Sequence, residues 1–251
     1  MQKFRTRSDD FQTLYNNNAA AVDGFNLERL YSLLIMGGLV LILPMMTAPL
    51  SQTRSQLVET YALISIFMFF TYCLFRLSFM KPYVKLALYV GFSIFIAFTI
   101  YLSLIHTPDM RATILLVVFS IFPSSFIDKP TRMNLFLIFW FVVHGLLAFH
   151  CKPTLAIDDI INTLGSMIAG ILIGNKMVWV RLESFNAYRL TAIERETDIL
   201  TGLHNRRKLF ETIVKLESDE YLEFPTAVIM IDIDHFKLFN DTFGHAMATI
   251  I

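Results

Sequence analysis

The sequence has no excess of either charge and little cysteine. Among its 251 residues, 21 basic side chains balance 21 acidic ones, so the overall charge gives no sign of a nucleic-acid partner. Hydrophobic residues make up 55% of the chain, more than is usual in soluble domains. The apolar residues are concentrated before residue 181, and this concentration predicts a membrane protein.

Six apolar stretches are each close to the ~20 residues that a helix needs to cross the hydrocarbon core of a bilayer. They cover residues 30–50, 57–77, 84–105, 110–127, 133–149 and 157–180. We expect residues 30–180 to form an α-helical membrane domain of six spans, preceded by a polar cytoplasmic tail, residues 1–29. The limits of these stretches are soft, so five or seven spans are alternatives. A cleaved signal peptide is disfavoured by the long polar lead and the five apolar stretches that follow the first.

Basic residues indicate how the spans are oriented. With the amino terminus inside, the three outer loops hold one basic residue each and the inner segments hold the rest. The outer residues are Arg54, Arg111 and Lys152, and the inner ones up to residue 189 are Lys3, Arg5, Arg7, Arg29, Arg76, Lys81, Lys85, Lys129, Arg132, Lys176, Arg181 and Arg189. The positive-inside rule therefore predicts a bacterial inner (plasma) membrane protein with both termini in the cytoplasm.

This orientation separates the two cysteines, Cys73 and Cys151, by the bilayer core of about 30 Å, whereas a disulfide needs Cα atoms within about 7 Å. We therefore expect two free thiols. Few ionisable residues lie inside the spans, which disfavours a transporter. Of these, His144 is expected to bond a neighbouring helix, with proton relay as the alternative.

Several potential metal ligands fall on the outer side of the predicted membrane domain. A metal or redox sensing site there is an alternative function for this half, although the spacing fits no known ligand signature. The residues concerned are His106, Asp109, His150, Cys151, Asp158 and Asp159.

The composition changes abruptly after Val180. Residues 181–197 are charged and free of glycine and proline, so they are predicted to continue the last span as a helix. A dimerising signalling helix and a solvated linker both fit this pattern. Residues 198–207 then read D-I-L-T-G-L-H-N-R-R, in which Gly202 permits a sharp bend and Asn205 is predicted to start an amphipathic helix.

A second motif follows a run of apolar and β-branched residues. Residues 226–233 predict a strand buried on both faces. At its end Asp232 and Asp234 are two residues apart, so on a strand their side chains point the same way. Together with Lys237 and Asn240 they make up the parts of a metal-assisted phosphate site, because carboxylates hold Mg²⁺ and lysine meets phosphate charge.

The two motifs, D-x-L-T-G-L-x-N-R-R and I-D-I-D-H-F-K-x-x-N-D-x-x-G-H, closely resemble the opening of the GGDEF family of diguanylate cyclases. The resemblance implies an α/β, nucleotidyl-cyclase-like domain over residues 198–251. It also implies that two GTP molecules are joined into cyclic di-GMP at the interface of a domain dimer, with Mg²⁺ as cofactor. The implied partners are GTP, a second copy of the chain through spans and linker, and membrane lipid.

The resemblance also implies roles for individual residues. It assigns metal binding to the carboxylate of Asp232 and the backbone carbonyl of Ile233, triphosphate contacts to Phe236 and Lys237, a guanine bond to Asn240, and a position in the substrate site to His245.

The sequence departs from the family after His245. The family continues with x-x-G-D, but here Ala248 and Thr249 follow, and no G-G-D-E-F occurs in the 251 residues. We therefore expect a truncated, unstable domain with no catalytic residue present, in a cyclase-type protein that is inactive as this chain. The alternative is a non-catalytic sensor that dimerises with and modulates an intact cyclase. Because Ala-Thr-Ile is what codons for Gly-Asp-His give after loss of one base, a frameshift is our hypothesis for this ending, and resequencing tests it.

Overall fold

The computed structural model describes residues 7–50, 56–198 and 201–218, and a few single positions between 229 and 242. The chain divides into two units, Met1–Asn186 and Ala187–Ile251. The first unit is a bundle of helices. Its last helix, Ala156–Glu196, continues into the second unit.

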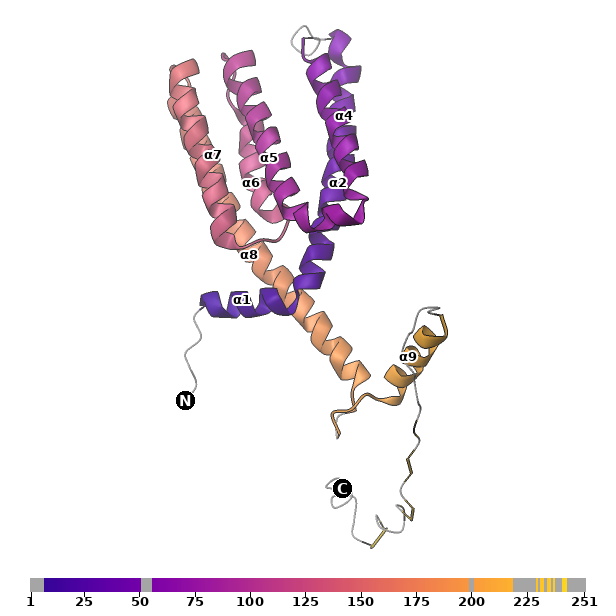
Figure 1. Ribbon diagram of the computed structural model, residues 1–251. Helices are drawn as coiled ribbons and strands as arrows, with labels where there is room; N and C mark the ends of the chain where they lie inside the picture. Colours follow the sequence, from indigo (N-terminus) through magenta and orange to yellow (C-terminus); the bar gives the residue numbers. More distant parts are fainter. Residues whose placement is uncertain are drawn as a thin grey trace. The chain divides into compact units, whose positions relative to one another are not determined.

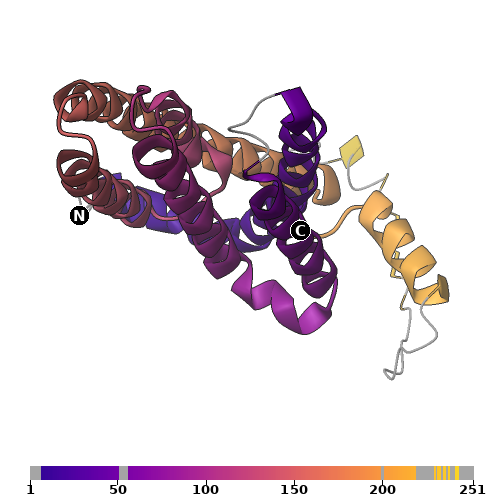
Figure 2. The same ribbon diagram turned by 90° about the horizontal axis from the view of Figure 1, so that it is seen from above.

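The bundle is built from helices that lie side by side. α5 and α6 lie between the antiparallel pair α2 and α4 and the pair α7 and α8 (Figure 1), and the view from above gives the same order (Figure 2). The bounds are α2 Ala19–Met46, α4 Val58–Phe75, α5 Val84–Tyr101, α6 Thr113–Ser125, α7 Pro130–Cys151 and α8 Ala156–Glu196. Shorter turns are the 3-10 segments Ala48–Leu50 and Ser78–Tyr83 and the π-helical segment Leu102–His106.

Five of these helices are long and apolar enough to cross a membrane: α2, α4, the continuous segment Ser78–His106, α7 and α8. Their exposed faces carry large apolar side chains, as expected of surfaces that face lipid; examples are Leu43, Phe69, Leu146 and Leu172, each about two-thirds exposed. The prediction of long apolar helices is thus confirmed for five of the six stretches, and these candidate spans suggest a multi-pass membrane protein.

The fourth predicted stretch, residues 110–127, differs from the prediction. Only 13 of its residues are helical, in α6, and 13 residues rise about 20 Å, less than the core of about 30 Å. The chain leaves the helix at Phe126, which is extended, and stays extended at Lys129. Pro130 explains the extended conformation of Lys129, because a residue before proline is disfavoured in the helical conformation.

Two glycines let α6 approach α8 closely. A Cβ atom on Gly170 would overlap the carbonyl oxygen of Phe119, and one on Gly174 would overlap the side chain of Pro123. Small residues at this spacing allow helix backbones to meet in membranes. The short helix is therefore held against the long one by backbone contact.

The amino-terminal segment is more ordered than the predicted tail. Residues Arg7–Asn17 form helix α1, which runs across the end of the bundle (Figure 1), and α2 begins at Ala19 rather than at residue 30. Phe11 explains the helix, because its ring packs edge-on against Trp179 of α8 with the centroids 5.8 Å apart. Apolar residues Leu14 and Tyr15 extend the same face.

The second unit begins with the end of α8, which stays helical to Glu196 as predicted. The side chain of Asp198 then accepts hydrogen bonds from the backbone N–H and hydroxyl of Thr201, at 3.0 and 3.1 Å. Gly202 has a φ of 67°, a conformation that favours glycine. Asn205 caps helix α9 (Arg206–Ser218) by accepting a 3.2 Å bond from the N–H of Lys208, so the predicted bend and helix start are both confirmed.

Candidate functional site

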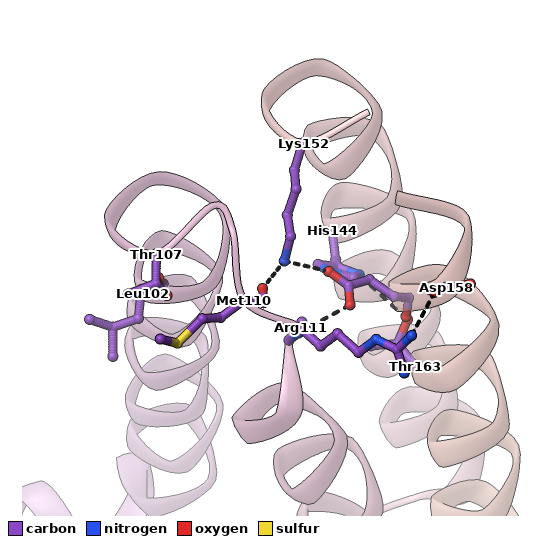
Figure 3. A network of polar contacts seen from close by, with 10 residues as sticks. Leu102, Thr107, Met110, Arg111, His144, Lys152, Asp158 and Thr163 are labelled. Atoms are coloured by element: carbon purple, nitrogen blue, oxygen red, sulfur yellow. Dashed lines mark hydrogen bonds and ion pairs between the residues drawn. The ribbon is translucent and has the colours of Figure 1, made fainter. Parts of the chain in front are cut away.

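A network of charged side chains lies where α7 ends and α8 begins (Figure 3). The ammonium of Lys152 pairs with Asp159 at 2.8 Å, and both side chains are only 1% exposed. Lys152 also donates a hydrogen bond to the carbonyl of Met110. A buried ammonium in contact with a buried carboxylate is compensated in charge, whereas either group alone would be costly.

The same carboxylate ties down the start of α6. Its other oxygen accepts a 3.1 Å hydrogen bond from the backbone N–H of Ala112. Asp159 lies in the first turn of α8, where the helix dipole favours a negative charge. A second pair, Arg111 with Asp158 at 3.0 Å, is more than half exposed. The network therefore joins the end of α7, the beginning of α8 and the loop before α6.

His144 lies next to this network, inside α7. Its side chain is fully buried, and its Nδ1 is 3.5 Å from the hydroxyl of Thr163 on α8. That hydroxyl donates to the backbone carbonyl of Asp159 at 2.7 Å, so its oxygen is left to accept from the imidazole. The prediction that His144 contacts a neighbouring helix is confirmed.

Two of the outer-side residues that were considered as metal ligands form ion pairs instead. Asp158 and Asp159 are ion-paired with Arg111 and Lys152. Within the ranges that the structure describes, no group of three or more His, Cys, Asp or Glu side chains comes together. Cys73 and Cys151 are both free, as predicted, and both are exposed. The buried pairing of Lys152 was not predicted from the sequence. The sequence feature that could have indicated it is a lysine and an aspartate on either side of the short turn between two apolar stretches.

A second set of polar contacts fixes the opposite end of the bundle. The amide of buried Asn26 on α2 both donates to and accepts from the backbone of Ile127, each at 2.8 Å. The hydroxyl of Tyr89 donates to Asp128 at 3.0 Å. Arg181 of α8 donates to the carbonyl of Ser124 at 2.7 Å. These contacts satisfy the backbone where α6 gives way to α7.

The predicted nucleotide-site residues fall mostly beyond the residues that the structure describes. Asp232 and Lys237 are described and exposed. Ile233, Phe236, Asn240 and His245 lie outside the described residues, as does most of the strand predicted at 226–233. The donor set of Asp232 and Ile233, a carboxylate and a backbone carbonyl, consists of hard oxygens and matches the chemistry that Mg²⁺ prefers.

Comparison with known proteins bears on this part of the chain. Residues 195–250 match the family described as diguanylate cyclase, GGDEF domain. The chain is 50% identical over 50 residues to diguanylate cyclase DgcP of Escherichia coli, which is 20% of this chain and 15% of DgcP. It is 49% identical over 55 residues to response regulator PleD of Caulobacter vibrioides, 20% of this chain and 11% of PleD.

Diguanylate cyclase DgcZ of Escherichia coli is 39% identical over 71 residues, which is 28% of this chain and 23% of DgcZ. The chain thus spans less than a quarter of the length of each of these relatives. No solved structure matches the chain. Residues 195–250 therefore carry GGDEF-domain sequence of the diguanylate cyclase family, after a helical region with five long apolar helices.

Proposed function

We propose that this chain belongs to a membrane-anchored signalling protein of the diguanylate cyclase type, in which the helical bundle governs a GGDEF domain that starts near residue 195. One observation carries the proposal: α8 is a single helix from Ala156 to Glu196 that leads directly into the Asp198–Asn205 turn at the start of the matched sequence. A continuous helix leaving a span is a direct covalent link between a membrane sensor and a cytoplasmic enzyme domain.

The contacts at the two ends of α6 support six crossings of the membrane. At one end, Ala112 bonds Asp159 at the start of α8. At the other, Ile127 bonds Asn26 of α2, and Ser124 bonds Arg181 of α8. Because α6 and its extended continuation connect the same two ends of the bundle as α7 and α8, the start of α2 and the end of the apolar part of α8 lie on one side. The positive-inside rule places that side in the cytoplasm of a bacterial inner membrane.

The native cysteines test this orientation. Cys73 lies near the inner end of α4 and Cys151 at the outer end of α7, and both are exposed. A membrane-impermeant maleimide applied to intact spheroplasts is expected to label the Cys73→Ser variant, which keeps Cys151, and to spare the Cys151→Ser variant. Labelling of the Cys151→Ser variant would show that the orientation is the opposite of the one proposed.

At the proposed nucleotide site, Asp232 and the Ile233 carbonyl would hold Mg²⁺, Phe236 and Lys237 would lie beside the triphosphate, Asn240 would bond guanine, and His245 would line the site. The metal, when bound, offsets negative charge on the phosphates of GTP. Purified chain is expected to bind a fluorescent GTP analogue more tightly with Mg²⁺ than without it. Asp232→Asn should remove this difference, whereas Glu211→Gln, on the exposed face of α9, should keep it.

Residues 1–251 contain no G-G-D-E-F signature, and we propose that they make no cyclic di-GMP by themselves. The experiment compares cells expressing residues 1–251 with cells expressing residues 1–197 joined to the GGDEF domain of DgcP. Only the fusion is expected to raise cyclic di-GMP, as measured by mass spectrometry. Synthesis of cyclic di-GMP by residues 1–251 alone would refute the proposed inactivity. A fusion that makes no cyclic di-GMP would count against the proposal that the membrane half supports a cyclase domain.

The alternative is a non-catalytic protein that dimerises with an intact cyclase. The long exposed helix end of α8, which carries Tyr188, Leu190 and Ile193 on its surface, favours it. A fall in cyclic di-GMP on co-expression of residues 1–251 with the fusion would support this second function.

A further inference from the structure

Two arginines of the bundle, Arg29 and Arg181, differ from cations near them that pair with a carboxylate. At the end where α7 meets α8, Arg111 and Lys152 each contact a carboxylate. At the opposite end, Lys85 pairs with Asp23 and Arg132 with Asp128. Arg29 of α2 and Arg181 of α8, at that same end, form no ion pair within the part of the chain that the structure describes. Both guanidiniums instead lie against the ring of Phe25, each with its central carbon 4.8 Å from the ring centroid.

The ring holds both guanidiniums in place. Phe25 is half-buried and packs edge-on against Phe185 of α8, with the centroids 6.0 Å apart, so its position is fixed by the bundle. A guanidinium on an aromatic face keeps its N–H groups free to donate at its edge. Arg181 uses one of these groups on the carbonyl of Ser124 and has others left. Arg29 is exposed.

Two cations on one ring repel each other, and the nearest acidic residues in sequence do not compensate them. Glu28 and Glu183 are exposed and form no ion pair in the described residues. An anion bound near the two guanidiniums would offset this repulsion. Arginine is suited to such a ligand, because its planar fork donates two parallel hydrogen bonds to a phosphate.

The position of the pair identifies the source of the phosphate. Arg29 directly precedes the apolar stretch 30–50, and Arg181 directly follows the apolar stretch 157–180. Both arginines therefore mark the same boundary of the apolar bundle, at the level of the lipid headgroups. We propose that Arg29 and Arg181, oriented by Phe25, bind the phosphate of an anionic phospholipid of the inner leaflet; the leaflet rests on the orientation given under Proposed function.

Binding of lipid to the purified protein tests the proposal independently of orientation and of cyclase activity. Residues 1–251 in detergent are titrated with dioleoyl phosphatidylglycerol or with dioleoyl phosphatidylcholine, and bound lipid is counted by native mass spectrometry. The wild-type chain should prefer phosphatidylglycerol. Each of Arg29→Gln and Arg181→Gln should weaken that binding about fivefold, and the double variant about thirtyfold.

The controls separate a built site from general attraction. Arg111→Gln, at the other end of the bundle, should leave the affinity unchanged, and Arg29→Lys should lose less than Arg29→Gln because it keeps the charge. Thermal unfolding shows whether each variant is folded. If Arg181→Gln does not fold, the comparison of Arg29→Lys with Arg29→Gln tests the site in its place. Equal binding of the two lipids, or an equal loss with Arg111→Gln, would overturn the proposal. Full displacement of the lipid by millimolar inorganic phosphate would show a site for soluble phosphate and would overturn the lipid assignment.

Discussion

Replacing Lys152 with methionine is expected to lower the stability of the bundle sharply, because it leaves the carboxylate of Asp159 buried without its countercharge. Both side chains are 1% exposed, so solvent cannot replace the lost partner. Methionine has nearly the length of the lysine stem and fills the same space, so little of the effect comes from a cavity. What is lost is the 2.8 Å ion pair and the bond to the Met110 carbonyl.

Removing one member of a buried ion pair costs about 3–5 kcal/mol. A change of 1 kcal/mol moves the melting temperature of a domain of about 150–250 residues by roughly 2–4 °C. Lys152→Met is therefore expected to lower Tm by about 6–20 °C. The neighbouring pair provides a matched control: Arg111 and Asp158 are 3.0 Å apart, close to the 2.8 Å of the buried pair, but their side chains are 63% and 51% exposed.

An exposed pair contributes about 0–1 kcal/mol, so Arg111→Met should change Tm by less than about 4 °C. Unfolding in detergent can be followed by tryptophan fluorescence, since Trp140 and Trp179 both lie in the bundle. The double variant Lys152→Met with Asp159→Asn removes both charges and keeps an acceptor for the Ala112 N–H. It should recover most of the lost stability, because a neutral replacement of a buried pair is often tolerated. Equal shifts for Lys152→Met and Arg111→Met would refute the reasoning.

Three further predictions concern packing and capping. Gly170→Ala should cost about 1–3 kcal/mol by overlap with α6, while Gly165→Ala, which meets open space on the same helix, should not, as thermal unfolding can show. Asn26→Leu leaves the backbone N–H and C=O of Ile127 without hydrogen-bond partners and should lower the free energy of unfolding by about 2–5 kcal/mol. Hydrogen exchange at the Ile127 amide should become faster, and unchanged exchange there would exclude this mechanism. Asn205→Ala should destabilise α9 by about 1 kcal/mol, seen as faster exchange of its first-turn amides and contradicted if only later turns respond.

Features that depend on local sequence could be predicted. The long apolar helices follow from run length alone, because a helix must be apolar for about 20 residues to cross the core. The bend at Gly202 and the cap at Asn205 follow from residue types with strong conformational preferences. The family resemblance likewise rested on two local motifs, and residues 195–250 match the corresponding family.

Features that depend on distant contacts could not be predicted. Hydropathy treats residues 110–127 as one apolar run, but the helix ends at Ser125, and the backbone of Ile127 is bonded instead by Asn26, 101 residues away. The helical fold of α1 depends on a contact with Trp179 on the last long helix. Charge counting assigns Lys152 to a loop, whereas its pairing with Asp159 shows that it is buried.

The buried pair has an electrical consequence for how the protein enters the membrane. In the proposed orientation, the turn between α7 and α8 must be carried outward across a membrane that is negative inside. Moving a lone lysine that way costs about 2.3 kcal/mol per 100 mV of membrane potential. Lys152 and Asp159 are seven residues apart, so their charges cancel when the hairpin crosses, and Asp158 beside them leaves residues 152–159 with a net charge of −1. A membrane potential that is negative inside therefore favours the outward movement of this hairpin, whereas it would oppose that of a lone lysine.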